Sequence, residues 1–180
     1  MSAVDGIFAV YMSRGSNAYG GERVSQLEHA LQTALLAEQS GADSPLIVAS
    51  LLHDYGHLIH KSGAGAARHV NYCHEALGAE NLAAFFGDAV TVPIRLHVEA
   101  KRFLCGIAHE YAKILSPASS RSLELQGGSF TAGEADAFIQ RPFAADAVKL
   151  RRWDESAKQF ALRTPDLEYF RPHLEACLFR

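Results

Sequence analysis

The sequence of 180 residues predicts an all-α protein that folds as a single helical bundle. Apolar residues recur at helical spacing, for example Leu27, Leu31, Ala34 and Leu35. Helix start signals occur along the whole chain, and no clear alternation of apolar and polar residues suggests a half-buried strand. Because we find no internal repeat, low-complexity tract or linker, we expect residues 1–180 to form one domain.

The first two helices expected from these signals cover residues 24–40 and 46–60. The first ends at Gly41, a residue type that commonly terminates helices. The second follows Ser44, an expected N-cap, and Pro45, which suits the first helical position. Residues 46–60 are apolar nearly all round, so this helix should lie at the centre of the protein.

Cap signals and prolines mark the remaining expected helices. One covers residues 70–86 and the next 88–104, where Pro93 would break or kink the first half. Ser116 and Pro117 start a short helix, and Thr131 with Glu134 forms a capping box for another. The next-to-last expected helix covers residues 143–159, and the last begins at residues 164–165. Residues 63–65 and 126–128 are expected loops.

Composition and charge exclude several classes of protein. The chain is 48% hydrophobic and 21% charged, which is ordinary for a globular domain. A net charge of −3 gives no basic footprint for nucleic acid. The longest apolar run, residues 45–52, is too short to span a membrane, and the first residues lack the basic region of a secretory signal. The three cysteines show no CxxC spacing, so we expect reduced thiols and a cytoplasmic location.

The dipeptide His53-Asp54, at the end of the most apolar stretch, is the strongest sign of chemistry. Asp is rarely buried unless it is paired or binds a metal. A single His on an apolar helix is more often structural, and His-Asp pairs also occur by chance. The series of further His and Asp residues on expected helices favours a two-metal site of iron, manganese, nickel or zinc. The candidate ligands are His29, His53, Asp54, His74, His97 and Asp154.

The order His29, His53-Asp54, Asp154 resembles the signature of the HD-domain superfamily, in which a helical bundle converges on one or two metals. His74 and His97 match the members that hold two metals, which include phosphodiesterases and diiron oxygenases. Longer stretches resemble the organophosphonate-degrading oxygenases of the PhnZ and TmpB type, and nearer the TmpB type. These stretches lie within about residues 17–160: Tyr19-Gly-Gly-Glu22, Gln26-Leu-Glu-His29, and residues 97–104, 123–128 and 149–154.

This resemblance implies two iron ions in a mixed-valent Fe(II)/Fe(III) pair, with O2 as co-substrate. His29, His53, Asp54 and Asp154 would hold one iron, with Asp54 bridging, and His74 and His97 would complete the second. Tyr19 would cap an iron until substrate binds, Glu22 would share its mobile loop, and His57 would lie near the substrate. The residues expected around the phosphonate are Lys101, Ser116, Gln126 and Arg151.

The implied reaction is oxidative cleavage of the C–P bond in a small-molecule 1-hydroxy-2-aminoethylphosphonate, supplied by an upstream phosphonate hydroxylase. The preferred substrate is (R)-1-hydroxy-2-(trimethylammonio)ethylphosphonate, which would give glycine betaine and phosphate. The free amine, (R)-1-hydroxy-2-aminoethylphosphonate, is the alternative and would give glycine and phosphate. A cationic nitrogen would suit Glu22, or the aromatic faces of Tyr19, Tyr72 or Phe103.

Two other functions remain open from the sequence. A metal-dependent HD phosphohydrolase would use the same ligands to activate water for attack on a phosphate ester, without oxygen or a capping tyrosine. A catalytically inactive HD module would bind a ligand for regulation, although the intact ligand set argues against it.

Overall fold

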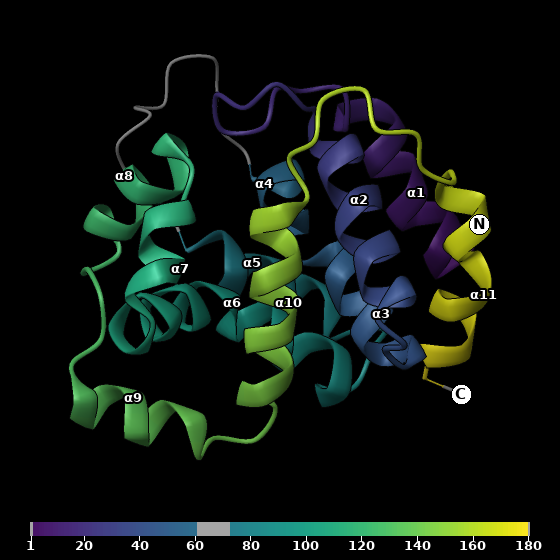
Figure 1. Ribbon diagram of the computed structural model, residues 1–180. Helices are drawn as coiled ribbons and strands as arrows, with labels where there is room; N and C mark the ends of the chain where they lie inside the picture. The colour runs from purple at the N-terminus through teal and green to yellow at the C-terminus, as the bar shows by residue number, and fades with distance from the viewer. Residues whose placement is uncertain (1, 61–72, 180) are drawn as a thin grey trace.

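The computed structural model describes residues 2–60 and 73–179, and within these ranges it contains helices and two isolated β-bridges but no extended strand. This confirms the all-α class (Figure 1). The helices are, in chain order, α1 (Ala3–Arg14), α2 (Gln26–Gln39), α3 (Ser44–Leu52), α4 (Tyr55–Ile59), α5 (His74–Leu82), α6 (Asp88–Ile107), α7 (His109–Ile114), α8 (Pro117–Leu125), α9 (Ala132–Ile139), α10 (Ala144–Ser156) and α11 (Leu167–Cys177).

The helix expected over residues 46–60 is interrupted at His53-Asp54, so that prediction was wrong in its centre. α3 ends at Leu52 and α4 begins at Tyr55, because Asp54 has φ −101° and ψ 12°, outside the helical region. Successive residues of an unbroken helix point about 100° apart. The break removes that restriction and lets both side chains face one site. At the start of α3, Asp43 rather than Ser44 is the N-cap, and its Oδ1 accepts the N–H of Leu46 (3.2 Å).

The other helices differ less from the predicted boundaries. α1 and α7 were not predicted, although Ser2 and Asp5 form a capping box at the start of α1. α6 continues through Pro93, because a proline in the second turn of a 20-residue helix removes only one early hydrogen bond. α11 begins two residues later than expected, after the N-cap Asp166. The expected loop at 63–65 and residues 70–72 of the expected helix 70–86 lie outside the described residues.

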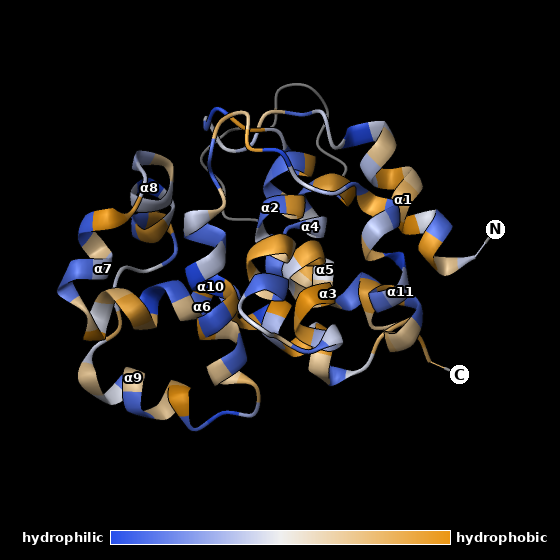
Figure 2. Ribbon diagram, turned by 45° about the vertical axis from the view of Figure 1, so that its right-hand side comes forward, coloured by the Kyte–Doolittle hydropathy of each residue, from blue (hydrophilic) through white to orange (hydrophobic). Residues whose placement is uncertain are grey.

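Two hydrophobic clusters form the interior, and α6 and α10 contribute to both. Val90 and Ile94 of α6 pack with α3 in the larger cluster, whereas Ala100 and Leu104 pack with α9 in the smaller one. Figure 1 shows α7, α8 and α9 on one side of α10, and α1 and α11 on the other. Figure 2 shows strongly hydrophobic residues along the central α3. Among the described helices, none has the length and apolarity that crossing a bilayer requires.

The backbones of α4 and α5 meet at two glycines. A Cβ on Gly56 would lie 2.0 Å from the carbonyl oxygen of His74, and one on Gly78 would lie 3.0 Å from the nitrogen of Gly56. Any larger side chain at position 56 would therefore push the helices apart. The same close approach stacks the His57 ring on the His74 ring, with centroids 4.0 Å apart.

We predict that Gly56→Ala lowers the free energy of unfolding by about 1–3 kcal/mol, the usual cost of overpacking a filled interior. The matched control is Gly6→Ala in α1, where an added Cβ meets nothing within 4 Å. That change should be neutral or stabilise by about 0.5–1 kcal/mol, because alanine favours helix interiors over glycine. Urea unfolding of both variants is the measurement, and equal stabilities would contradict the close approach.

Candidate metal centre and substrate cavity

Six buried His and Asp side chains converge on one site, from five different parts of the chain. None is more than 9% exposed. His29 comes from α2, the His53-Asp54 pair from the break between α3 and α4, and the others from α5, α6 and α10. The sequence therefore identified residues that the fold brings together. The set is His29, His53, Asp54, His74, His97 and Asp154.

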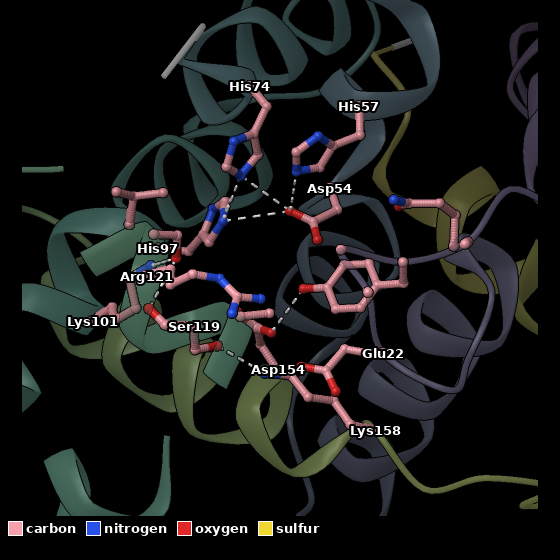
Figure 3. A pocket seen from close by; sticks show the side chains of 18 of the residues that line it. Glu22, Asp54, His57, His74, His97, Lys101, Ser119, Arg121, Asp154 and Lys158 are labelled. Atoms are coloured by element: carbon pink, nitrogen blue, oxygen red, sulfur yellow. Dashed lines mark hydrogen bonds and ion pairs between the residues drawn. The ribbon is translucent and has the colours of Figure 1, made fainter. Parts of the chain in front are cut away.

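The Asp54 carboxylate lies between two groups of imidazoles, with one oxygen toward each. Figure 3 shows the side of His74 and His97. Its Oδ1 is 3.2 Å from Nε2 of His74 and 3.6 Å from Nε2 of His97. Its Oδ2 is 3.4 Å from Nε2 of His53 and 3.8 Å from Nε2 of His29. A carboxylate has separate lone pairs on its two oxygens, so this placement suits a bridge between two cations.

Asp154 completes the group formed by His29 and His53. Its Oδ1 is 3.3 Å from Nε2 of His29 and 3.9 Å from Nε2 of His53. The second carboxylate oxygen pairs with Arg151 three residues earlier in α10. This ion pair fixes the orientation of Asp154 while leaving Oδ1 directed at the histidines.

Backbone carbonyls fix the tautomers of three histidines. Nδ1 lies 2.8 Å from the carbonyl oxygen of Ala157 for His29, 2.9 Å from that of Ser50 for His53, and 2.7 Å from that of Ile94 for His97. A carbonyl oxygen only accepts hydrogen bonds, so Nδ1 carries the proton when the ring is neutral. Nε2 then presents a lone pair to the centre, as in most histidine ligands of metals.

The electrostatics of the group keep the carboxylates charged. Burial alone would raise the pKa of Asp54, but the neighbouring His53 charge and hydrogen bonds from His53 and His74 hold it well below its usual value. Burial also opposes ionisation of Asp154, whose pKa is likewise held low by Arg151 and His29. Burial and the nearby His74 lower the pKa of His57 to about 3, so its ring is neutral at pH 7.

These features fit a pair of metal ions. Nε2 atoms of His29 and His53 lie 3.1 Å apart, and those of His74 and His97 lie 3.2 Å apart, with their lone pairs converging. Among the described residues, two sets offer ligand atoms within 4.8 Å of one another: His29, His53 and Asp154, and Asp54, His57 and His74. Burial lowers the pKa of His53, but Asp54 and Asp154 raise it to about 9, so a cation would displace a proton there.

Tyr19 and Glu22 lie on a tight turn that closes over the His29 side of the centre. The Tyr19 hydroxyl is 3.5 Å from Asp154 Oδ1, and its ring stacks on His29 with centroids 3.8 Å apart. Gly20 and Gly21 have φ of 53° and 91°, a left-handed conformation that glycine adopts without strain. Burial and Asp154 raise the pKa of Tyr19 well above its usual value, so the phenol is protonated without a cation beside it.

A cavity of about 1180 Å³ opens beside the six residues. Basic and amide side chains also line this cavity, and such donors can bind a phosphonate dianion. Lys101 donates to Ser122 Oγ (2.6 Å), and burial and Arg151 lower its pKa to about 8. Gln126 Oε1 is buried and, within the described residues, accepts no hydrogen bond. The predicted residues Lys101, Gln126 and Arg151 thus line one cavity.

Ser116 differs from these three because it is not among the residues that line the cavity. Its hydroxyl caps α8 by accepting the N–H of Ser119 (3.1 Å) and also accepts from Lys158 (3.1 Å). Ser116, which was predicted to lie beside the phosphonate, therefore does not reach the cavity directly. Ser119, one helical turn further, lines the cavity instead.

Sequence reasoning missed a buried network around Glu155. One carboxylate oxygen of Glu155 accepts the Ser116 N–H (2.8 Å) and a hydrogen bond from Lys158 (2.9 Å), and the other accepts the Ser119 hydroxyl (2.8 Å). Arg151 also pairs with it. The i, i+4 spacing of Arg151 and Glu155 could have indicated an ion pair, but such spacing is common on solvated helix faces.

The aromatic candidates for an amine site are not gathered in the cavity. Phe103 packs against Phe138 in the smaller cluster, with ring centroids 5.2 Å apart. Tyr72 lies outside the described residues. Tyr19 is the aromatic residue among the described ones that lines the cavity, and its ring face is used by His29.

The chain is similar to known proteins over almost its whole length. No protein-family model matches the chain. It is 46% identical over 177 residues to the hydroxymethylphosphonate dioxygenase of Gimesia maris, across 97% of this chain and 88% of that protein. It is 39% identical over 173 residues to the glycine-betaine-forming 1-hydroxy-2-(trimethylamino)ethylphosphonate dioxygenase of Leisingera caerulea, across 96% and 88%. An uncharacterized protein of Acanthamoeba polyphaga mimivirus is 33% identical over 174 residues.

The position of Asp54 between the two imidazole groups leads to a prediction about metal content. Asp54→Asn keeps the size of the side chain but loses its charge and one of its two acceptor oxygens. We expect bound metal to fall from two ions per chain to one or fewer after dialysis, measured by plasma mass spectrometry. Glu99→Gln, an exposed residue of α6 two positions after His97, is the control and should retain both ions. Two ions in Asp54→Asn would contradict the shared-carboxylate arrangement.

Proposed function

The chain belongs to the phosphonate dioxygenases of the PhnZ/TmpB type, and from this premise we propose that it uses dioxygen to cleave the C–P bond of a 1-hydroxyphosphonate. The observation that carries the proposal is the placement of Asp54 between two buried groups of histidines, next to a cavity lined by cations. In the reaction C1 becomes a carboxylic acid and phosphorus leaves as phosphate. The substrate supplies the four electrons that reduce both oxygen atoms.

We assign two iron ions to the six buried ligands. Neutral imidazoles and carboxylates suit iron, and a mixed-valent Fe(II)/Fe(III) pair would supply the site that binds dioxygen and takes up electrons. His29, His53 and Asp154 would hold one ion and His74 and His97 the other, and Asp54, which lies between the two groups, would serve both. The two ligand groups differ in charge, because the group of His29 and His53 includes Asp154 as an additional carboxylate. Such unequal groups would suit two irons of different charge.

The residues of the chain bind and orient the substrate. Lys101 and Arg151 offer cationic donors to the phosphonate, and Gln126 offers its amide. The Arg151 guanidinium also pairs with Asp154, so it links the phosphonate site to the metal ligands. His57, neutral and stacked on His74, lines the cavity with its Nε2 3.9 Å from Asp54 Oδ1. Tyr19 covers the centre until substrate displaces its loop.

Two substrates are compared because one carries an ammonium group on C2 and the other has only hydrogen on C1. The preference for (R)-1-hydroxy-2-(trimethylammonio)ethylphosphonate rests on the TmpB-like stretches and agrees with the relative that forms glycine betaine. Hydroxymethylphosphonate is a second candidate, supported by the relative with 46% identity and by the cation Lys158 beside Glu22. Its balanced reaction with O2 gives formate, phosphate and one proton.

A phosphohydrolase could use the same six ligands, so the ligand set does not separate the two reactions. The named relatives favour the oxygenase, and they argue equally against a regulatory module without activity. A hydroxylase acting on an unhydroxylated phosphonate would supply the substrate. Such a pathway fits the cytoplasmic location expected from the cysteines.

The iron assignment predicts a specific magnetic signature. Protein reconstituted with iron and partly oxidised should show the EPR signal of a spin-coupled Fe(II)/Fe(III) pair, and the signal should change when a 1-hydroxyphosphonate is added. Phosphate release should require both iron and dioxygen. Full turnover with zinc or magnesium, or without oxygen, would instead favour a phosphohydrolase.

The capping role of Tyr19 predicts a change in the absorption spectrum. A phenolate bound to ferric iron gives a charge-transfer band, and Tyr19→Phe should abolish that band while leaving two irons bound. Tyr169→Phe is the control, because that hydroxyl bonds to Glu38 at the exposed surface of α11. A band of equal strength in Tyr19→Phe, or its absence from the wild type without substrate, would contradict the role.

A further inference from the structure

Lys158 is a cation of the substrate cavity that the reaction described so far does not use. It follows the end of α10, and its Nζ lies 3.8 Å from Glu22 Oε1. Only 10% of its side chain and 18% of that of Glu22 are exposed. Figure 3 shows these two side chains next to each other, at the far end of the cavity from His57 and His74.

The Lys158 charge is held in a fixed position. Nζ donates to Ser116 Oγ (3.1 Å), Ser119 Oγ (2.8 Å) and Glu155 Oε1 (2.9 Å). An ammonium group has three N–H donors, and these three acceptors use them all. The lysine is therefore a fixed part of the cavity wall, unlike most lysines, whose side chains move freely in solvent.

Glu22 is consequently a poor site for a second cation. Its Oε1 is buried and, among the described residues, accepts no hydrogen bond, so Lys158 opposes its charge from ion-pair distance. A substrate ammonium that approached Glu22 would be attracted by the carboxylate and repelled by Lys158 from a similar distance. Glu155 is the closer partner of Lys158, but it also pairs with Arg151, so the Lys158 charge still opposes that of Glu22. The attraction and the repulsion felt by the ammonium then act against each other, whereas the loss of hydration on entering the cavity remains.

A hydrogen atom or an uncharged group in the same place meets no such repulsion. Like charges placed in a site are a common way to exclude the wrong substrate. Lys101, Arg121 and Arg151 also line the cavity and remain for the phosphonate that all candidate substrates share.

Resting on the proposed C–P cleavage, we propose that Lys158 is the specificity-determining residue at the carbon end of the substrate. By opposing the charge of Glu22, it makes the enzyme favour 1-hydroxyphosphonates whose C1 carries only hydrogen or an uncharged group over those with an ammonium group on C2. The smallest favoured substrate is hydroxymethylphosphonate.

The test compares three compounds: hydroxymethylphosphonate and the 1-hydroxyethylphosphonates that carry a free amine or a trimethylammonium group at C2. kcat/KM for phosphate release is measured in air, and Kd is measured by anaerobic titration calorimetry of the iron-loaded protein. The wild type should prefer hydroxymethylphosphonate at least tenfold. Lys158→Gln should shift this ratio at least tenfold toward the ammonium compounds, which is about 1.4 kcal/mol in transition-state binding.

Three further variants isolate the charge. Lys158→Arg keeps the charge and should keep the wild-type ratio within threefold. Lys158→Gln combined with Glu22→Gln removes both charges and should return the ratio toward that of the wild type, because the two residues act on each other. Lys149→Gln, an exposed lysine of α10 that pairs with Asp146, should change nothing.

The two readouts separate this inference from the proposed reaction. If no compound releases phosphate but the Kd ratio still shifts in Lys158→Gln, the C–P cleavage fails and the role of Lys158 stands. A tenfold preference of the wild type for either ammonium compound overturns the inference and leaves the C–P cleavage intact. A ratio that Lys158→Gln does not change in either readout, or the lack of binding by all three compounds, also overturns it.

Discussion

The buried charge of Asp54 is the constraint on which the arrangement of helices depends. A carboxylate in an apolar interior is costly unless opposite charges or donors surround it. Here four imidazole Nε2 atoms lie within 3.8 Å of its two oxygens, and they come from α2, the α3–α4 break, α5 and α6. Each of these helices must keep its position to satisfy the same group. The contact of Gly56 with the His74 backbone is one means by which the positions are fixed.

The sequence predicted the elements whose signals are local. The Thr131 capping box and the start of α8 at Ser116 appear as expected, because caps depend on residues three or four apart. The histidine and aspartate series was found because buried charge is rare on apolar helices. The break at His53-Asp54 was missed, since it is set by what the two side chains must face and not by a helix-breaking residue. Lys158 was missed because its three acceptors come from α8 and the end of α10, which the sequence does not connect.

Proposed metal ligands and cations both line the cavity, and α10 contributes to both sets through Asp154 and Arg151. Asp154 faces the histidines while Arg151, one turn earlier, pairs with it and with Glu155. Glu155 in turn binds the first turn of α8, which carries Ser119 into the cavity wall. A displacement of α8 would therefore reach the ligands of the centre through two ion pairs. Under the proposed function, these contacts would link recognition of the phosphonate to the orientation of Asp154.

The ligands are widely separated in sequence, which affects how the centre is made in the cell. Tyr19 and Asp154 are 135 residues apart, and the Nδ1 partner of His29 is the carbonyl of Ala157, 128 residues away. During synthesis the ribosome releases the N-terminal segment first, so five of the six proposed ligands emerge before Asp154. Until α10 appears, the histidines lack both a carboxylate and the acceptor that sets a tautomer. A nascent chain can therefore hold at most an incomplete ligand sphere, and the final set of ligands assembles only once translation has passed residue 157.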